Sequence, residues 1–175
     1  MAQILLLYSG MKMQKTIREA VRFSGIGLHT GFDINVRILP SAEDTGITFV
    51  RKDVPCAPAI RAEASNVVNT SYATTLGLNG VTISTVEHLM AAFYGLGIDN
   101  AIVELDGPEV PIMDGSSSHF IELIEGAGFE TLTSPRRYFV IKRPIRVAVG
   151  DKYVALLPAD DIVLTIDYSI DFSHP

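Results

Sequence analysis

The sequence has little of several features that would assign a class of protein directly. Its single cysteine, Cys56, excludes an intrachain disulfide and fits a reducing compartment. The chain has 14 Lys and Arg against 20 Asp and Glu, a formal net charge of −6, and so lacks the basic surface that binds a nucleic-acid backbone. No apolar run approaches the roughly 18 residues that a membrane-spanning helix requires. The sequence therefore predicts a protein without nucleic acid as a partner and without a membrane span.

The motifs of several common enzyme classes are absent as well. The chain has no P-loop, no Gly-x-Ser-x-Gly elbow, no Cys-x-x-Cys and no His-Glu-x-x-His. Apolar side chains, in contrast, are plentiful: 47% of the residues are hydrophobic and 19% are charged, and the mean hydropathy is +0.28. This composition argues against disorder and predicts a well-filled core. The 175 residues allow one complete domain and part of another.

Two hydrophobic periodicities alternate along the chain. Apolar and polar residues alternate at 17–23 and at 33–38, which predicts two half-buried strands. The three glycines within residues 24–31 predict a tight hairpin loop between these strands, and His29 at its tip is a candidate to face a site. Further strands are predicted at residues 46–51, 98–105, 138–149, 152–157 and 162–169.

Two segments carry the 3.6-residue periodicity of a helix. The first spans about 85–94 and is followed by two glycines, of which Gly97 suits a left-handed cap. The second begins after Asp114-Gly115-Ser116 and ends near Gly126 or Gly128. Two helices with several antiparallel strands predict an α+β fold, namely a two-layer domain of a mainly antiparallel sheet with both helices on one face.

The pattern divides the chain into three parts. Residues 1–10 are predicted to be an extra N-terminal segment, residues 11–133 the first α+β domain, and residues 134–175 the beginning of a truncated second domain. The turn-forming run Thr133-Ser134-Pro135 marks the predicted boundary. Beyond it the pattern predicts strands with no helix to cover them, and such a sheet cannot bury its apolar face alone.

Glu87 and His88 stand side by side at the predicted start of the first helix. Ser84 lies three residues before Glu87, a spacing that predicts a capping box and gives Glu87 a structural reason of its own. A histidine beside an apolar stripe more often packs than binds, although the same pair also suits one metal ligand and the base of a metal hydrolase. Asp99 and Asp114 are further candidate carboxylates, but nothing near them distinguishes them from turn and cap residues. The residue types alone leave both interpretations open.

Four motifs follow one another in a recognisable order. They are Val-Arg-Phe-Ser-Gly-Ile-Gly-Leu-His-Thr-Gly at 21–31, Ile-Ser-Thr-Val-Glu-His-Leu at 83–89, Gly-Leu-Gly-Ile-Asp-Asn at 95–100 and Pro-Ile-Met-Asp-Gly-Ser at 111–116. In order and spacing they resemble the UDP-3-O-acyl-N-acetylglucosamine deacetylases, the zinc amidases that commit bacteria to lipid A synthesis. The resemblance continues through Ile166-Asp167-Tyr168 to Asp171-Phe172-Ser173-His174-Pro175. It therefore covers nearly everything after residue 11.

This resemblance implies a reaction and a set of site residues. The family hydrolyses the N-acetyl amide of UDP-3-O-acyl-N-acetylglucosamine and releases acetate, with Zn2+ as cofactor. By motif, His88 resembles a zinc ligand and Glu87 the general base that activates water, which suits zinc-dependent hydrolysis. Phe172 resembles the family's aromatic contact to the uridine. His29, with its loop, resembles part of the wall of the site.

The resemblance also implies a setting for the protein. The family has two domains of similar topology, each a sheet with two helices, which face one another across the active site. The enzyme is expected in the cytoplasm of a Gram-negative type of bacterium. Its lipid-like substrate is expected to come from the inner membrane surface, which implies peripheral contact with that membrane.

One part of the family's site is missing from this sequence. The other two zinc ligands, a histidine and an aspartate one helical turn apart, and a histidine that protonates the leaving amine come from the second domain, beyond Pro175. His119 fits the cap of the second helix and His174 belongs to the Asp-Phe-x-His-Pro motif, so neither substitutes. Because catalytic zinc needs about three protein ligands, we expect an N-terminal portion that is inactive alone and requires the missing C-terminal half.

Two interpretations of the chain other than an enzyme stay open. One is a noncatalytic half domain that binds a nucleotide sugar or a partner chain. The other is a purely structural domain in which Glu87 caps the helix and His88 packs.

Overall fold

The computed structural model describes residues 3–4, 12–159 and 164–171. The chain divides into two compact units, a first unit of Met11–Arg136 and a second unit of Met1–Gly10 with Arg137–Pro175. The first unit contains both α-helices and three of the four predicted site residues. The fourth, Phe172, lies outside the described residues.

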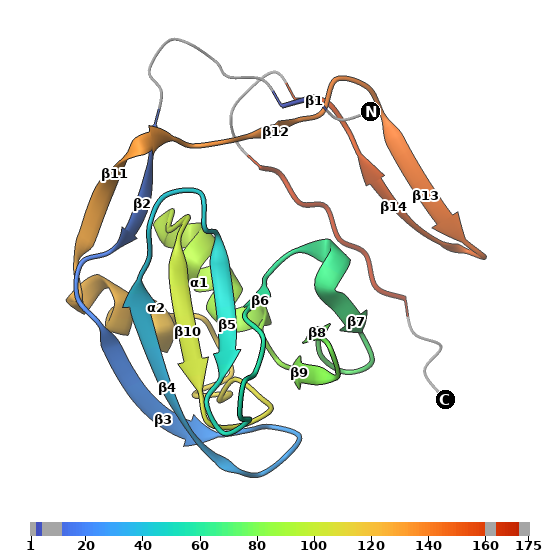
Figure 1. Ribbon diagram of the computed structural model, residues 1–175. Coiled ribbons are helices and arrows are strands. Elements are labelled where there is room, and N and C mark those ends of the chain that lie inside the picture. The colour runs from blue at the N-terminus through green and yellow to red at the C-terminus, as the bar shows by residue number, and fades with distance from the viewer. Residues whose placement is uncertain (1–2, 5–11, 160–163, 172–175) are drawn as a thin grey trace. The chain divides into compact units, whose positions relative to one another are not determined.

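The first unit is built on a five-stranded sheet that is antiparallel except for one pair (Figure 1). Its strands are, in spatial order, β3 (Val21–Ile26), β4 (Asp33–Pro40), β10 (Ala101–Leu105), β5 (Ile47–Arg51) and β6 (Ile60–Arg61). The parallel pair is β10 and β5, with Val103 opposite Phe49. In β4 the side chains of Ile34, Val36 and Ile38 are buried and the polar ones between them are exposed, as the alternation predicted.

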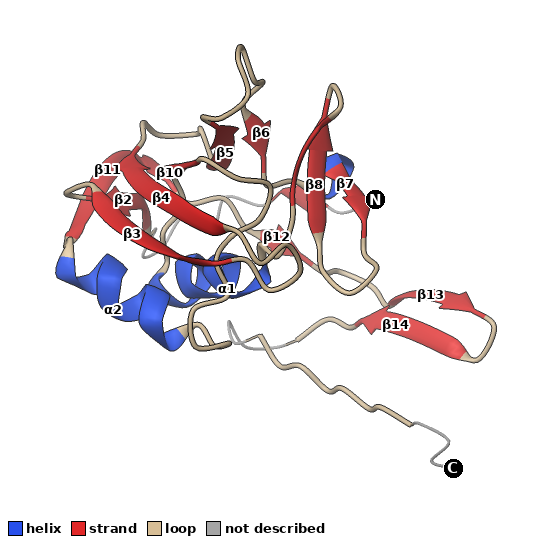
Figure 2. Cartoon of the chain, turned by 90° about the horizontal axis from the view of Figure 1, so that it is seen from below, coloured by secondary structure: helices blue, strands red, loops and turns tan. Residues whose placement is uncertain are grey.

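Both α-helices lie on the same face of this sheet, as Figure 2 shows. Helix α1 spans Glu87–Leu96 and helix α2 spans Ser118–Gly126. The residues that the two helices bury completely are Leu89, Ala92, Phe93, Phe120 and Ile124. Phe120 packs edge-on against Phe23 of β3, with the ring centroids 5.6 Å apart. The predicted α+β fold with two helices and mainly antiparallel strands is confirmed.

Helix α1 ends about two residues later than predicted, and the second of the two glycines caps it. Gly97 has a φ of 70°, in the left-handed region that glycine adopts without steric cost, and its amide bonds back to the carbonyl groups of Phe93 and Tyr94. No helix in the described part of the chain is long and apolar enough to cross a membrane.

Two smaller sheets complete the first unit. One is an antiparallel meander that follows a short 3-10 helix, η1 (Ala64–Asn66), and consists of β7 (Val67–Asn69), β8 (Thr75–Leu78) and β9 (Val81–Ile83). The other pairs β2 (Met13–Ile17) with β11 (Phe129–Pro135) in antiparallel fashion. The meander leads directly into α1 and so carries the chain to the candidate site.

Several predicted boundaries in this unit differ from the structure, and β6, the β7–β9 meander and β11 were not predicted. The single strand predicted at 17–23 is divided between two strands. Ile17 is the last residue of β2, which pairs with β11, and Val21 is the first residue of β3, which pairs with β4. The run Thr133-Ser134-Pro135, predicted as a turn, belongs to β11, in which Pro135 lies opposite Met13. The strand pairing with β2 therefore extends through the predicted turn to Pro135.

The described residues of the second unit form four short strands. They are β1 (Gln3–Ile4), paired with β12 (Phe139–Val140), and the hairpin of β13 (Ile145–Val149) and β14 (Lys152–Leu156). The strand predicted at 138–149 is thus two strands, and residues 164–169, the described part of the strand predicted at 162–169, form none. Every residue of the hairpin is exposed, including Val149 at 80%. The hairpin has no core of its own within the described residues.

Candidate functional site

Glu87 and His88 are the first two residues of α1, and both are half-buried. The Glu87 carboxylate accepts a hydrogen bond from the backbone amide of Thr74, the residue that precedes β8. The partial positive charge of the helix N-terminus also favours a carboxylate in this turn. The Ser117 hydroxyl, just before α2, donates to the His88 carbonyl oxygen at 3.0 Å. Glu87 is therefore held at its carboxylate and His88 at its backbone.

The capping box predicted for this helix start is wrong. Val86 occupies the N-cap position, and no side chain in the described part of the chain caps α1. The segment after β10 engages Ser84 instead: the Ser84 amide donates to the Pro108 carbonyl at 2.9 Å, and the Ser84 carbonyl accepts from the Val110 amide at 3.0 Å. Thr85 then adopts a left-handed conformation with a φ of 57°. This turn separates the serine from the helix that it was predicted to cap.

A fully buried carboxylate, Glu109, joins the β3–β4 hairpin loop to the residues that enter α1. It accepts hydrogen bonds from the His29 amide (3.1 Å), the Thr30 amide (3.0 Å) and the Thr30 hydroxyl (2.9 Å). On the other side it accepts one from the Thr85 hydroxyl at 2.7 Å. The loop that carries His29 is therefore tied to the start of the helix that carries the predicted base and metal ligand.

The hydrogen bonds around Glu109 decide its charge. Burial raises the pKa of Glu109, but hydrogen bonds from Thr85, His29 and Thr30 outweigh burial and hold the pKa below its ordinary value. Because the pKa is lowered on folding, the ionised carboxylate stabilises the fold above the ordinary value of 4.5, and this contribution is lost as the pH falls through the folded-state pKa. The carboxylate is therefore charged at neutral pH.

Gly27, the first residue of the hairpin loop, lies against this carboxylate. A Cβ added at Gly27 would lie 2.5 Å from the Glu109 Oε2 atom and closer still to the Thr30 hydroxyl. Such distances are well inside van der Waals contact. The absence of a side chain at Gly27 allows the loop to close around Glu109.

We expect Gly27→Ala to destabilise the protein by about 1–3 kcal/mol, because the added methyl group overpacks the loop. A urea or thermal unfolding curve measures the change. Gly95→Ala is the matched control, since a Cβ at this position in α1 meets nothing within 4 Å. Alanine there should be neutral or stabilise the helix by up to ~1 kcal/mol. Equal stability of the Gly27→Ala variant and the wild type would contradict the close packing of the loop.

The structure brings His29 to this region through its backbone. The residue is exposed, and its amide rather than its ring contacts Glu109. His119, near the start of α2, is also exposed. The predicted uridine contact Phe172 and the motif residue His174 lie outside the described residues. Of the four predicted site residues, the structure therefore gathers Glu87, His88 and the His29 backbone around the start of α1.

Asp99 and Asp114 have structural partners. Asp99 forms an ion pair with Arg136 at 2.8 Å and accepts from the Lys15 amide at 2.9 Å, which fixes the chain after α1. Asp114 accepts from the amide and the hydroxyl of Ser116, both at 3.0 Å, and these hydrogen bonds lower the pKa of Asp114. Asp99 therefore connects the chain after α1 to β2, and Asp114 stabilises the turn before α2.

The ring of His88 offers a free coordinating position. Its Nδ1 atom is buried and has no hydrogen-bond partner within the residues that the structure describes. Buried polar atoms almost always have a partner, so an unpaired ring nitrogen suits a bound group. In the same described ranges, no group of three His, Cys, Asp or Glu side chains could hold a metal ion. His88 can thus contribute one ligand to a metal that the described residues do not surround.

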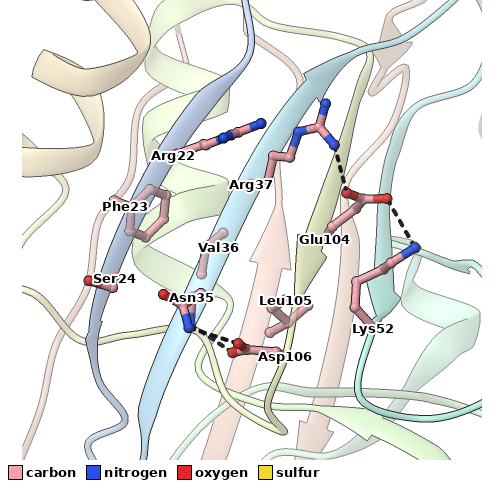
Figure 3. A pocket seen from close by; sticks show the side chains of 10 residues that line it. All are labelled: Arg22, Phe23, Ser24, Asn35, Val36, Arg37, Lys52, Glu104, Leu105 and Asp106. Atoms are coloured by element: carbon pink, nitrogen blue, oxygen red, sulfur yellow. Dashed lines mark hydrogen bonds and ion pairs between the residues drawn. The ribbon is translucent and has the colours of Figure 1, made fainter.

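A hollow of about 440 Å³ lies elsewhere, over strands β3, β4 and β10. Figure 3 shows Glu104 between Arg37 and Lys52, at 3.6 and 3.5 Å from their nitrogen atoms. These charges pair with one another, and neither Glu87 nor His88 lines the hollow. The hollow is separate from the candidate site.

Sequence reasoning missed two groups at this site. Glu109 stands in the run Pro108-Glu109-Val110-Pro111, and a single charge in an apolar, proline-rich stretch is a signal of burial that could have been noticed. The backbone amide of Thr74 has no sequence signal, because its role depends only on where the chain passes.

Comparisons with known proteins agree with the motifs. Residues 14–175 match the family model described as LpxC: UDP-3-O-acyl N-acetylglycosamine deacetylase. The chain is 47% identical over 165 residues to the UDP-3-O-acyl-N-acetylglucosamine deacetylase of Citrifermentans bemidjiense, covering 94% of the chain and 53% of that relative. It is 45% identical over 166 residues to the protein of the same name from Shewanella oneidensis, covering 94% and 54%. The chain spans about half the length of these curated relatives.

Proposed function

Because the chain belongs to the UDP-3-O-acyl N-acetylglycosamine deacetylase family, we propose that it supplies one side of the active site of a zinc-dependent amide hydrolase. The substrate is UDP-3-O-acyl-N-acetylglucosamine, the compound in the names of its relatives, and the reaction releases acetate in lipid A synthesis. The observation that carries this proposal is the first turn of α1, where Glu87 has a carboxylate fixed by a hydrogen bond and the next residue, His88, has a buried, unpaired ring nitrogen.

Glu87 is proposed as the general base. Its carboxylate is oriented by the Thr74 amide, which leaves its other oxygen to accept a proton from the attacking water. A base whose rotamer is fixed before the substrate arrives loses less orientational freedom in the reaction. This is why a hydrogen bond from a backbone group, which cannot rotate away, supports the assignment.

His88 is proposed as a ligand of the zinc ion. The unpaired Nδ1 atom supports this assignment, because that ring nitrogen has no hydrogen-bond partner among the described residues and imidazole is a common zinc ligand. When bound, zinc polarises the amide carbonyl and lowers the pKa of water toward about 7. We propose that the other ligands come from the part of the full-length protein that corresponds to the unmatched half of the relatives.

The substrate-binding residues are proposed by motif. Phe172 would contact the uridine, and the loop of His29 would line the site, where the hydrogen bonds to Glu109 fix its backbone. We propose the cytoplasm as the location, with the lipid-like substrate reached by peripheral contact with the inner membrane. The proposed domain division is 11–133 and 134–175, with 1–10 as an extra segment.

The proposal is tested by comparing the isolated 175 residues with the full-length protein, meaning the product of the complete coding sequence that contains them. Acetate release from UDP-3-O-acyl-N-acetylglucosamine and zinc content after dialysis are measured for both. We expect one zinc per chain and turnover in the full-length protein, loss of turnover with a chelator, and recovery with added zinc. We expect weak zinc binding and no turnover from the isolated residues.

Two results would contradict the proposal in different ways. Tight zinc and normal turnover from the isolated residues would show that they contain a complete site. A full-length protein that binds zinc but releases no acetate would show that the reaction is wrong. Reading the coding sequence past Pro175 provides an earlier check, since a His-x-x-x-Asp motif with helical periodicity is expected there.

A further inference from the structure

Glu109 is a buried charge that the proposed chemistry does not use. It is 0% exposed, yet it forms no salt bridge with any residue that the structure describes. Four neutral donors hold it, namely two amides and two hydroxyl groups. Burying a carboxylate without a cation is costly unless its hydrogen bonds are well made. The buried carboxylate of Glu109 therefore points to a role in holding its donor segments in place.

The donors belong to two segments that are far apart in the sequence. One is the hairpin loop, through the His29 and Thr30 amides, and the other is Thr85. The loop closes tightly around the carboxylate because Gly27 has no side chain. Glu109 thus fixes the wall of the proposed site and the helix start against one another.

Thr85 shows what the carboxylate does to the backbone. Its φ of 57° places a β-branched residue in the left-handed region, where such residues are genuine outliers. A conformation of this kind persists only where the surroundings fix it, and the 2.7 Å bond from its hydroxyl to Glu109 is such a restraint. Only Val86 separates Thr85 from Glu87, so the direction of the chain at Thr85 sets where α1 begins.

We propose that Glu109 is a positioning residue, which acts through Thr85 to orient Glu87 and His88 and through the loop amides to place His29. This inference rests on the proposed function, since it assigns Glu109 to the same reaction. Glu109 need not touch the substrate or the reacting atoms. Its removal should lower turnover strongly, because it displaces the base and the ligand. It should raise KM to a smaller extent, because it also loosens the loop of His29.

The experiment uses four variants of the full-length protein. Glu109→Gln removes the charge at nearly constant size, Thr85→Val removes the hydroxyl at constant shape, and Thr85→Ser keeps the hydroxyl. Glu104→Gln is the matched control, because it makes the same change just before Glu109 in the chain, at a half-exposed residue paired with Arg37 and Lys52. The values of kcat, KM, zinc content and Tm are measured, together with hydrogen exchange of the His29 and Thr30 amides.

We expect kcat to fall by about 10- to 100-fold in Glu109→Gln and Thr85→Val at temperatures where both are folded, with KM within about 3-fold of the wild type. Thr85→Ser should keep most of the activity, and Glu104→Gln should match the wild type. The His29 and Thr30 amides should exchange faster in Glu109→Gln only. Activity in Thr85→Ser would show that the hydroxyl group matters. A loss caused only by changed packing of the Thr85 methyl group would not be rescued by serine.

Two outcomes separate this inference from the proposed function. An active wild type with undiminished kcat in folded Glu109→Gln and Thr85→Val would overturn the positioning role alone. A wild type that binds zinc but releases no acetate would overturn the proposed function and, with it, the catalytic consequence of Glu109. Wild-type exchange of the His29 and Thr30 amides in Glu109→Gln would also contradict the restraint of the loop.

Discussion

Replacing Glu87 with glutamine in the full-length protein is expected to lower kcat for acetate release by about 10²- to 10⁴-fold, the usual contribution of a general base. Glutamine keeps the shape of the side chain, and its carbonyl oxygen can still accept from the Thr74 amide, so the fold should persist. It cannot take a proton from water. Zinc content should therefore stay near that of the wild type, because the base does not hold the metal.

The control for this variant is Glu122→Gln. Glu122 is exposed on α2, so the same chemical change should leave both zinc and kcat unaltered. Acetate release and zinc content are measured on the same preparations. A Glu87→Gln variant with kcat within about 3-fold of the wild type would reduce Glu87 to a residue that only fixes the loop before β8, since a base is worth far more than that.

Replacing His88 with alanine is expected to remove zinc as well as activity. One of about three protein ligands is lost, and zinc affinity should fall by more than the 10- to 100-fold typical when an outer-shell partner is removed. Turnover should fall at least as far as in Glu87→Gln. Because His88 Nδ1 has no partner among the described residues, the variant breaks no hydrogen bond of that nitrogen, and the fold should remain.

The matched control here is His119→Ala, at an exposed position of α2. It should keep full zinc and full activity. Isothermal titration with zinc and the acetate assay separate the two histidines. Full zinc occupancy in the His88→Ala variant would contradict its assignment as a ligand, even if activity were lost.

Local signals in the sequence were enough for both helices and for strands β3, β4, β5 and β10, but not for β6, the β7–β9 meander or β11. The alternation of Ile34, Val36 and Ile38 predicts β4 because one face of the strand is buried and the other is not. Gly97 predicts the end of α1 because the left-handed cap suits glycine. The resemblance drawn from four short motifs is confirmed by the family match over residues 14–175. These features depend on near neighbours in the chain.

The errors arose where distant segments meet. Ser84 and Glu87 have the spacing of a capping box, but Ser84 forms an isolated β-bridge with Glu109 instead. The backbone of Ser84 is hydrogen-bonded to Pro108 and Val110 in this bridge. The role of Glu109 depends on its hydrogen bond to the His29 amide, which lies 80 residues earlier in the chain. No local pattern encodes such a pairing. The same site therefore contains a pair of residues that a motif proposes and a carboxylate whose partners no local pattern indicates.

The central claim is that the start of α1 forms one side of a zinc centre, and the position of the metal tests it most directly. Anomalous diffraction at the zinc edge, from crystals of the full-length protein, locates the ion without reference to activity. The account predicts a zinc peak about 2.0–2.1 Å from a ring nitrogen of His88, with the Glu87 carboxylate beside it. A fully occupied zinc site elsewhere, with His88 unliganded in an active protein, would contradict the account.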